Sequence, residues 1–244
     1  MTYGLFGLVV LITHFIEGIT GFGCTVLALP FCMMLVGAKV AVPVLVFHAL
    51  VLAVYIVSIA AKAIQWREFL KIAAFVGLGL PVGIALFAFL DERVLKAVLG
   101  VFMIGVGARG LAAAVFAWQS RQRLPAWVYH GALFLGGCIH GAFGSGGPLV
   151  VIYAQKALPD KSHFRATICM LWTTLNTVMV AQSLARGIMT AEIWTIIAVT
   201  MPFLIGGALL GNWAHHHIQD RHFTQLVYLV LLVSGLFMFR GIGH

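Results

Sequence analysis

Charged side chains are scarce in this chain. Asp, Glu, Lys and Arg make up 9% of its 244 residues, whereas 62% of the residues are hydrophobic. A soluble domain carries roughly 25% charged residues, so this chain cannot cover itself with a water-compatible surface and is predicted to be a polytopic membrane protein. The formal net charge is +8, but most basic residues lie in short gaps between apolar runs. That placement sets membrane orientation and attracts anionic lipid, so nucleic acid is excluded as a partner.

Acidic residues and cysteines are also few, which argues against several kinds of catalytic or metal site. The three aspartates, Asp91, Asp160 and Asp220, all lie in gaps, so an aspartyl intramembrane protease is not expected. No Cys-x-x-Cys motif occurs, and the cysteines are expected to pack as small hydrophobes. These are Cys24, Cys32, Cys138 and Cys169.

Neither a metal nor a cofactor is predicted. His215, His216, His217 and His222 lack a carboxylate or cysteine framework, so they are expected to form an interfacial loop. Residues 21–26 are no dinucleotide fingerprint, because no strand–helix unit surrounds them.

Long polar segments are absent as well, so no soluble domain separates the apolar runs. Residues Met1–Leu5 carry no basic residue and no Ala-x-Ala-like site follows, so the first run is expected to be a membrane segment, not a cleaved signal. The predicted apolar runs are 2–16, 24–36, 40–61, 69–90, 93–117, 127–140, 147–158, 164–185, 189–213 and 223–241.

Glycine, in contrast, is abundant and patterned. Gly18-Ile19-Thr20-Gly21-Phe22-Gly23 and Gly141-Ala142-Phe143-Gly144-Ser145-Gly146 share the pattern Gly-x-x-Gly-x-Gly and start 123 positions apart. A polar residue precedes each motif, Glu17 in the first and His140 in the second. Glycine disfavours helix, and a helix broken at membrane depth is tolerated only where it faces protein or a water-filled cavity. Matched breaks in two halves point to a transporter's substrate site.

Further matches predict two repeats, 1–118 and 127–244, joined by a linker at 119–126. Lys62-x-Ile64-x-x-x-Glu68 matches Arg186-x-Ile188-x-x-x-Glu192 at an offset of 124. Pro81 with Gly83 resembles Pro202 with Gly206 and Gly207, at an offset of 121. Glu92-Arg93 resembles Asp220-Arg221.

Helix length and charge predict the topology. A single helix over 2–36 would be about 52 Å long, against a hydrocarbon core of about 30 Å. Each half is therefore predicted to begin with a glycine-broken or re-entrant segment that folds back, followed by three transmembrane helices. The second half is then inverted relative to the first. On this fold-back scheme one side collects nine basic residues and the other five, and single crossings would give seven on each side. The positive-inside rule favours fold-back, with both termini outside the cytoplasm. Arg109 lies inside a predicted helix and is left out of the count. The nine are Lys62, Arg67, Lys71, Arg121, Arg123, Lys156, Lys161, Arg165 and Arg221; the five are Lys39, Arg93, Lys96, Arg186 and Arg240.

The half-helix that follows each break is predicted to bind an anion. Its first backbone N–H groups have no intrahelical partner, and they and the helix dipole attract negative charge. Hydroxyl groups near the breaks could add donors. Close helix packing by small residues is the alternative use of the glycines. The candidate residues are Thr20, Gly21, Gly23, Cys24, Thr25, Gly144, Ser145, Gly146 and Gly147.

Other polar residues in apolar runs are candidates for anion binding or proton transfer. Arg165 could neutralise an oxyanion or anchor the helix at the cytoplasmic surface, and Trp172 and Asn176 belong to a polar patch on the same run. Glu17 is the only acidic residue deep in an apolar run, where an unpaired carboxylate costs about 2.5–3.5 kcal/mol. The candidates for a proton relay, or for a hydrogen-bonded pair that holds the bend, are His14, Glu17, His48 and His140.

Two other functions remain open from the residues alone. Ser145 near His140 invites an intramembrane serine hydrolase, although Phe143-Gly144-Ser145-Gly146 is not a Gly-x-Ser-Gly sequence. A non-transporting membrane scaffold is the other alternative. No catalytic residue is predicted.

The residues Gly18–Pro30, Gly141–Tyr153 and Arg165-Ala166-Thr167 resemble those of the TauE/SafE sulfite and organosulfonate exporter family. The second motif is the closer one, because Phe22, Cys24 and Thr25 depart from the usual pattern. The resemblance implies a multi-pass carrier in a bacterial inner membrane, with a small, often sulfur-containing anion as substrate. The expected partners are this anion and the lipid bilayer, and a homo-oligomer stays open. We therefore expect a secondary transporter that exports a small anion such as sulfite or an organosulfonate by alternating access, with proton coupling as an option.

Overall fold

The computed structural model describes residues 2–115, 125–158 and 160–215, and the single positions 217, 232 and 236, and nearly all of these lie in helices. The predicted linker, the last apolar run, His216, His222, Arg121, Arg123, Asp220, Arg221 and Arg240 lie wholly or largely outside the described residues. The helices are α1 (Thr2–Thr20), α2 (Cys24–Val36), α3 (Ala38–Ala60), η1 (Ala61–Ala63), α4 (Trp66–Phe89), α5 (Glu92–Val115), α6 (Ala126–Phe143), α7 (Gly147–Ala157), α8 (Lys161–Ala185) and α9 (Ala191–His215).

Six helices among the described residues are long and apolar enough to cross a membrane. They correspond to α1, α3 with η1, α4, most of α5, α8 and α9. Large apolar side chains on their outer faces are exposed; on α4, Leu70 is 63% exposed and Phe89 87%. In water such a surface would be unstable, so it is a surface for lipid. The predicted all-α polytopic membrane class is confirmed.

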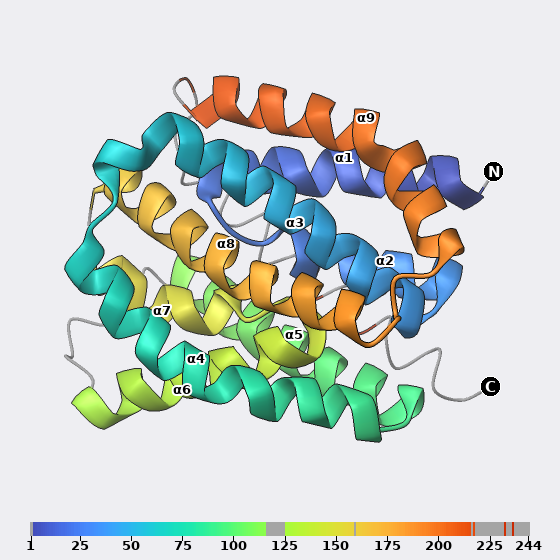
Figure 1. Ribbon diagram of the computed structural model, residues 1–244. Helices are drawn as coiled ribbons and strands as arrows, with labels where there is room; N and C mark the ends of the chain where they lie inside the picture. Colours follow the sequence, from blue (N-terminus) through green and yellow to red (C-terminus); the bar gives the residue numbers. More distant parts are fainter. Residues whose placement is uncertain are drawn as a thin grey trace.

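Both glycine-broken segments fold back as predicted. Figure 1 shows α1 running away from the N-terminus and α2 returning toward the same side of the molecule. In the second half α7 packs back on α6. The evidence is a close contact: a Cβ on Gly136 of α6 would lie 3.1 Å from Cγ2 of Val150 in α7. The break lies between these two residues in the sequence, so only a reversal of the chain brings them together.

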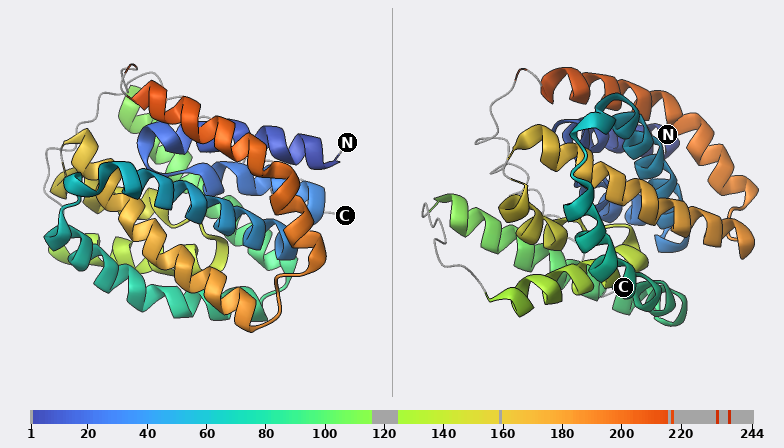
Figure 2. Two further views of the ribbon diagram at one scale, coloured as in Figure 1. Left: turned by 45° about the horizontal axis from the view of Figure 1, so that its top comes forward. Right: turned by 60° about the vertical axis from the view of Figure 1, so that its left-hand side comes forward.

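The longest helix pairings cross between the two halves. Helix α1 packs along α9, α4 packs along α6, and α3 packs against α8 near the centre (Figures 1 and 2). Among the candidate membrane spans of the described residues, α3 with η1 is the most buried. Its side chains form much of the apolar core, including Leu45, Leu52 and Ile56.

Helix α8 begins beside the ends of several other helices. Asp160 caps it by accepting a hydrogen bond from the backbone N–H of His163 at 2.8 Å, and this bond lowers the pKa of Asp160. Near this start, the backbone N–H of Gln65 donates to Thr167 Oγ1 at 2.9 Å, and Lys161 donates to the His215 carbonyl. The starts of α4 and α8 and the end of α9 therefore share one end of the molecule.

Candidate functional site

The first break occupies only the last part of its glycine motif. Helix α1 continues through Gly18, which packs against Gly211 of α9 and so serves helix packing. The helix ends where Gly21 adopts φ +82° and its N–H donates to the Glu17 carbonyl at 2.7 Å. Gly23 follows with φ +106°, and α2 starts at Cys24. Glycine is needed at these two positions because both φ values are positive.

The second break lies 123 positions later and repeats part of this geometry, because Gly144 corresponds to Gly21, whereas Gly146 has φ −68° where Gly23 has φ +106°. Gly141 lies inside α6, where a Cβ would overlap the Leu80 carbonyl oxygen of α4. Gly144 has φ +65°, and its N–H donates to the His140 carbonyl at 2.6 Å. Helix α7 starts at Gly147, with proline in its first turn. In each motif the first glycine serves helix packing, and the second, Gly21 or Gly144, has the positive φ at which the helix ends.

The Glu17 side chain occupies the start of α2. Its Oε2 accepts a hydrogen bond from the Cys24 N–H at 2.8 Å, and the residue is 3% exposed. A carboxylate at a helix N-terminus is stabilised by the free N–H groups and the dipole. One of the backbone donors expected to receive an external anion is therefore engaged by the protein itself.

One face of α8 connects the two breaks. Trp172 donates from Nε1 to the Gly21 carbonyl at 3.0 Å, and its indole stacks on the His140 ring with centroids 5.0 Å apart. His140 Nε2 lies 3.0 Å from Asn176 Oδ1. Cys169, three residues before Trp172, also contacts the Gly21 carbonyl through Sγ, at 3.7 Å. This helical stripe fixes the first break relative to the second.

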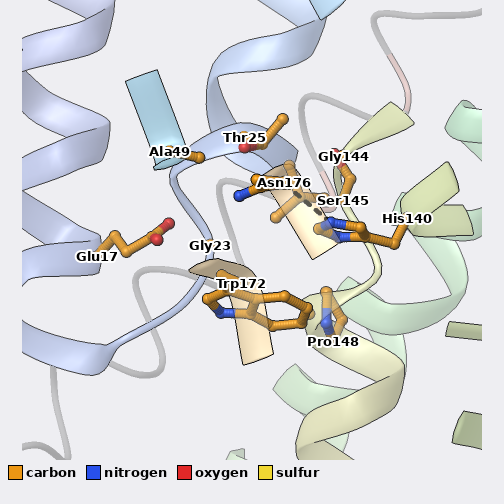
Figure 3. Close-up of a pocket in the computed structure, with 12 residues that line it drawn as sticks. Glu17, Gly23, Thr25, Ala49, His140, Gly144, Ser145, Pro148, Trp172 and Asn176 are labelled. Carbon is orange, nitrogen blue, oxygen red and sulfur yellow. Dashed lines mark hydrogen bonds between the residues drawn. The ribbon is translucent and has the colours of Figure 1, made fainter. Parts of the chain in front are cut away.

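A small pocket, called the cavity below, lies between the breaks (Figure 3). Apart from Gly23, every residue that lines it is buried. Its wall contains no Lys or Arg among the described residues, and Glu17 and His140 are its ionisable side chains. The lining residues are Glu17, Gly23, Thr25, Val26, Ala49, His140, Gly144, Ser145, Gly147, Pro148, Trp172 and Asn176.

Several predicted candidates lie beside the cavity and do not line it. The Thr20 hydroxyl donates to the Phe22 carbonyl at 2.7 Å, which stabilises the turn. Gly21 and Cys24 belong to the first break but are not among the residues that line the cavity. A Cβ on Gly146 would overlap the Gly136 carbonyl oxygen, so this glycine lets α7 approach α6.

Arg165 also lies away from the cavity. It is 4% exposed, packs against Gly21, and donates from Nη2 to Asn212 Oδ1 at 3.0 Å. Its Nε has no partner among the described residues. These contacts join α8 to α9 and to the end of α1, near the end of the molecule where α4 and α8 start.

His14 and His48 form a separate buried pair. Their ring centroids are 5.9 Å apart in an edge-on arrangement. His48 Nε2 lies 3.0 Å from Thr200 Oγ1, and each Nδ1 lies within 2.8 Å of a carbonyl oxygen one turn earlier in its own helix. The structure therefore separates these two histidines from His140, which lines the cavity.

Val26, Ala49 and Pro148 line the cavity but were not singled out as binding residues from the sequence. Their side chains are apolar and carry no chemical signature. The position of Ala49 next to His48, and of Val26 next to Thr25, was the only available signal. These residues give one part of the wall an apolar character.

The arrangement around Ser145 does not resemble a hydrolase. Its hydroxyl donates to the Phe143 carbonyl at 3.1 Å, while His140 Nε2 pairs with Asn176. A nucleophilic serine needs a base within hydrogen-bond reach, itself held by a third group. Among the described residues, no group of three His, Cys, Asp or Glu side chains could hold a metal ion either, and the four cysteines are free.

Comparison with known proteins gives a consistent assignment. Residues 5–238 match the family described as Sulfite exporter TauE/SafE. The chain is 27% identical over 179 residues to a "Probable inner membrane transporter protein TsaS" of Comamonas testosteroni, which covers 72% of each chain. No solved structure matches the chain. The resemblance seen in the glycine motifs is confirmed: the chain belongs to the TauE/SafE family of membrane transporters, and it is a multi-pass inner membrane protein, not an enzyme.

Proposed function

We propose that this protein carries a small sulfur oxyanion or organosulfonate across the inner membrane by alternating access around the cavity between the two breaks. The observation that carries the proposal is the convergence of two half-helix N-termini, those of α2 and α7, on one buried cavity. A buried site must open to one side and then the other to exchange its contents with both compartments. The family description and the name of the relative point to the same class of substrate.

The chemistry of the wall suits a sulfonate group with a short tail. At the α7 end, the Gly147 N–H has no backbone acceptor among the described residues, and the Ser145 hydroxyl would donate to an anion in place of the Phe143 carbonyl. Such donors at a helix N-terminus bind anions without a cationic side chain. The Asn176 amide and Thr25 hydroxyl add polar groups, and the apolar wall would accommodate carbon atoms.

Helix contacts support the proposed inverted repeat. A Cβ on Gly79 would overlap the Phe134 carbonyl oxygen, and one on Gly207 would overlap that of Leu11. Leu11 and Phe134 are 123 positions apart, and Gly79 and Gly207 are 128 apart. Equivalent packing thus recurs with the two halves exchanged.

A second pair of contacts follows the same registers. Gly83 packs on the Cys138 carbonyl, and Gly211 packs on that of Phe15. These contacts favour a register of 128 between α4 and α9 over the 121 expected from Pro81 and Pro202. The Glu92–Asp220 match has the same spacing of 128.

The distribution of basic residues supports the proposed orientation. With Arg109, which lies within α5, left out, six described basic positions lie at the end of the molecule where α4 and α8 start, against four at the other end. By the positive-inside rule the richer end faces the cytoplasm. The six are Lys62, Arg67, Lys71, Lys156, Lys161 and Arg165; the four are Lys39, Arg93, Lys96 and Arg186.

The proposal is tested by binding and flux with purified protein, using sulfite, sulfoacetate, taurine and small carboxylates. Gly147→Ala is the informative variant, because its Cβ would lie in ordinary contact with Phe22 and Trp172, at 3.5 and 3.6 Å, and would narrow the cavity without a clash. We expect it to weaken sulfoacetate transport more than sulfite transport. Gly131→Ala is the matched control, since nothing lies within 4 Å of its Cβ position.

Three outcomes would count against a carrier of this kind. Absence of binding to every anion would overturn the proposal. Absence of flux in proteoliposomes despite binding would favour a scaffold. Loss of all turnover in Ser145→Ala, with a chemically altered product from the wild type, would favour a hydrolase.

A further inference from the structure

The two half-helix N-termini are not equivalent. At the first break, the Cys24 N–H of α2 is bonded to the Glu17 carboxylate. At the second break, the position 123 residues after Glu17 holds His140, and no acidic side chain among the described residues lines the α7 end of the cavity. His140 is 2% exposed, and its Nδ1 has no partner among the described residues. One end of the cavity therefore contains a carboxyl group that already holds the helix start, and the other contains a histidine with an unpartnered ring nitrogen.

We infer that Glu17 is an internal anion which competes with the transported one, so that the site binds an anionic substrate only with Glu17 protonated, and one proton accompanies each anion. This inference rests on the proposed function and gives it a coupling mechanism. The transported anion would bind at the α7 N-terminus, across the cavity from Glu17.

Electrostatics within the cavity supports the competition. Glu17 and the bound anion would share one small cavity whose described wall holds no Lys or Arg. Two like charges in such surroundings repel strongly, because water does not screen them. A proton on Glu17 removes the repulsion and converts a carboxylate oxygen from an acceptor into a donor that can face the anion.

The proton balance is simple. A proton from the solution binds a carboxylate oxygen of Glu17 as the anion enters, and no other bond forms or breaks. When the cavity opens to the other side, the anion leaves and the carboxylate returns its proton to that solution. Glu17 again accepts the Cys24 N–H, which restores the closed, empty site.

Other titratable or charged groups surround Glu17 and could also make binding depend on pH. Arg165 stays charged at all relevant pH values, whereas a protonated histidine would attract an anion as a protonated Glu17 would. The experiment must therefore separate Glu17 from the histidines. These groups are His14 on α1, Cys24 on α2, His48 on α3, His140 on α6, Arg165 and Cys169 on α8, and His215 on α9.

The test is calorimetric binding of a simple alkanesulfonate, which stays ionised over the whole pH range, to purified protein from acidic to mildly alkaline pH. For the wild type we expect affinity to fall about tenfold per pH unit once Glu17 is ionised. Titrations in buffers of different ionisation enthalpy should show the uptake of one proton per anion. Glu17→Gln, which keeps an acceptor for the Cys24 N–H, should bind with no pH dependence and as tightly as the wild type at low pH.

Two further variants complete the design. Glu68→Gln is the control, because Glu68 lies outside the cavity and pairs with Lys71 and Tyr153, so it should behave as the wild type does. His140→Gln should keep the pH dependence. If His140→Gln abolishes it and Glu17→Gln retains it, the inference is overturned.

Binding by the wild type without proton uptake at any pH, the alkaline end of the range included, would also overturn the inference and leave the proposed carrier standing. Absence of alkanesulfonate binding at every pH would overturn the proposed function itself. If Glu17→Gln fails to fold, the proton uptake measured on the wild type decides the question alone.

Discussion

Gly144→Ala tests whether the second break depends on a left-handed residue at one position. Gly144 has φ +65°, and its N–H closes the end of α6 on the His140 carbonyl. An added Cβ would lie 2.6 Å from Cγ2 of Val46 in α3. The substitution therefore introduces both backbone strain and a steric overlap beside the cavity.

The expected loss of stability can be estimated from these two contributions. An L-residue in the left-handed region costs about 1–2 kcal/mol, and alanine recovers about 0.4–1 kcal/mol by restricting the unfolded chain. Overpacking against Val46 adds about 1–3 kcal/mol. We expect Gly144→Ala to lower the free energy of unfolding by about 3 kcal/mol, together with a loss of transport.

Two other glycines separate the contributions. Gly187 has φ +66° with nothing within 4 Å of its Cβ position, so Gly187→Ala should carry the backbone cost alone, about 1 kcal/mol. Gly131 lies inside α6 with open space around it, so Gly131→Ala should stabilise the protein by up to about 1 kcal/mol.

The assay is chemical denaturation of the purified protein in detergent, followed by flux in proteoliposomes. Val46→Ala in the Gly144→Ala background should recover the steric part, so the two changes should be less than additive. The reasoning is refuted if Gly144→Ala costs no more than Gly187→Ala, or if the double variant shows no coupling.

Trp172→Phe removes the hydrogen bond to the Gly21 carbonyl but retains an aromatic ring beside His140. The free energy of unfolding should therefore fall by about 1 kcal/mol, and transport should slow. An unchanged denaturation midpoint together with an unchanged transport rate would contradict this. A pH gradient across proteoliposomes should drive accumulation of a monovalent sulfonate by the wild type. A membrane potential should have little effect on this accumulation, because a proton and a monovalent anion together carry no net charge. Accumulation by Glu17→Gln under the same pH gradient would count against the coupling. The pKa of Asp160 is lowered in the folded protein, because its carboxylate accepts the His163 N–H. Its cap on α8 should therefore stabilise the fold above the ordinary aspartate pKa, and this stabilisation should be lost as the pH falls through the folded pKa. In an acid titration of thermal stability, Asp160→Asn should lack this acid-dependent loss; a wild-type acid response in Asp160→Asn would show that other groups cause it.

Much of the fold could be predicted from the sequence because its causes are local. A scarcity of charge excludes a water-exposed surface wherever the helices lie, and paired glycines allow positive φ values at the breaks whatever their neighbours are. These properties gave the membrane class, the fold-back of the first segment in each half and the family.

The use of each glycine and each polar group depended on the tertiary structure. Gly18 and Gly141 belong to the same motifs as the breaks, yet they remain helical because α9 and α4 approach them closely. The hydrogen bond from Trp172 to Gly21 joins residues 151 positions apart, and no local pattern encodes it. Such contacts place Arg165, His14 and His48 outside the cavity and His140 in its wall.

The sequence by itself thus determined that the chain crosses a membrane, where its two backbone breaks lie and that polar residues flank them. Only the tertiary structure decided that Glu17 already holds the start of α2 while the start of α7 faces a shared cavity. The physical reason is that φ preference is a property of single residues. The partner of a free N–H, in contrast, is chosen by whichever side chain the packed helices bring within hydrogen-bond reach.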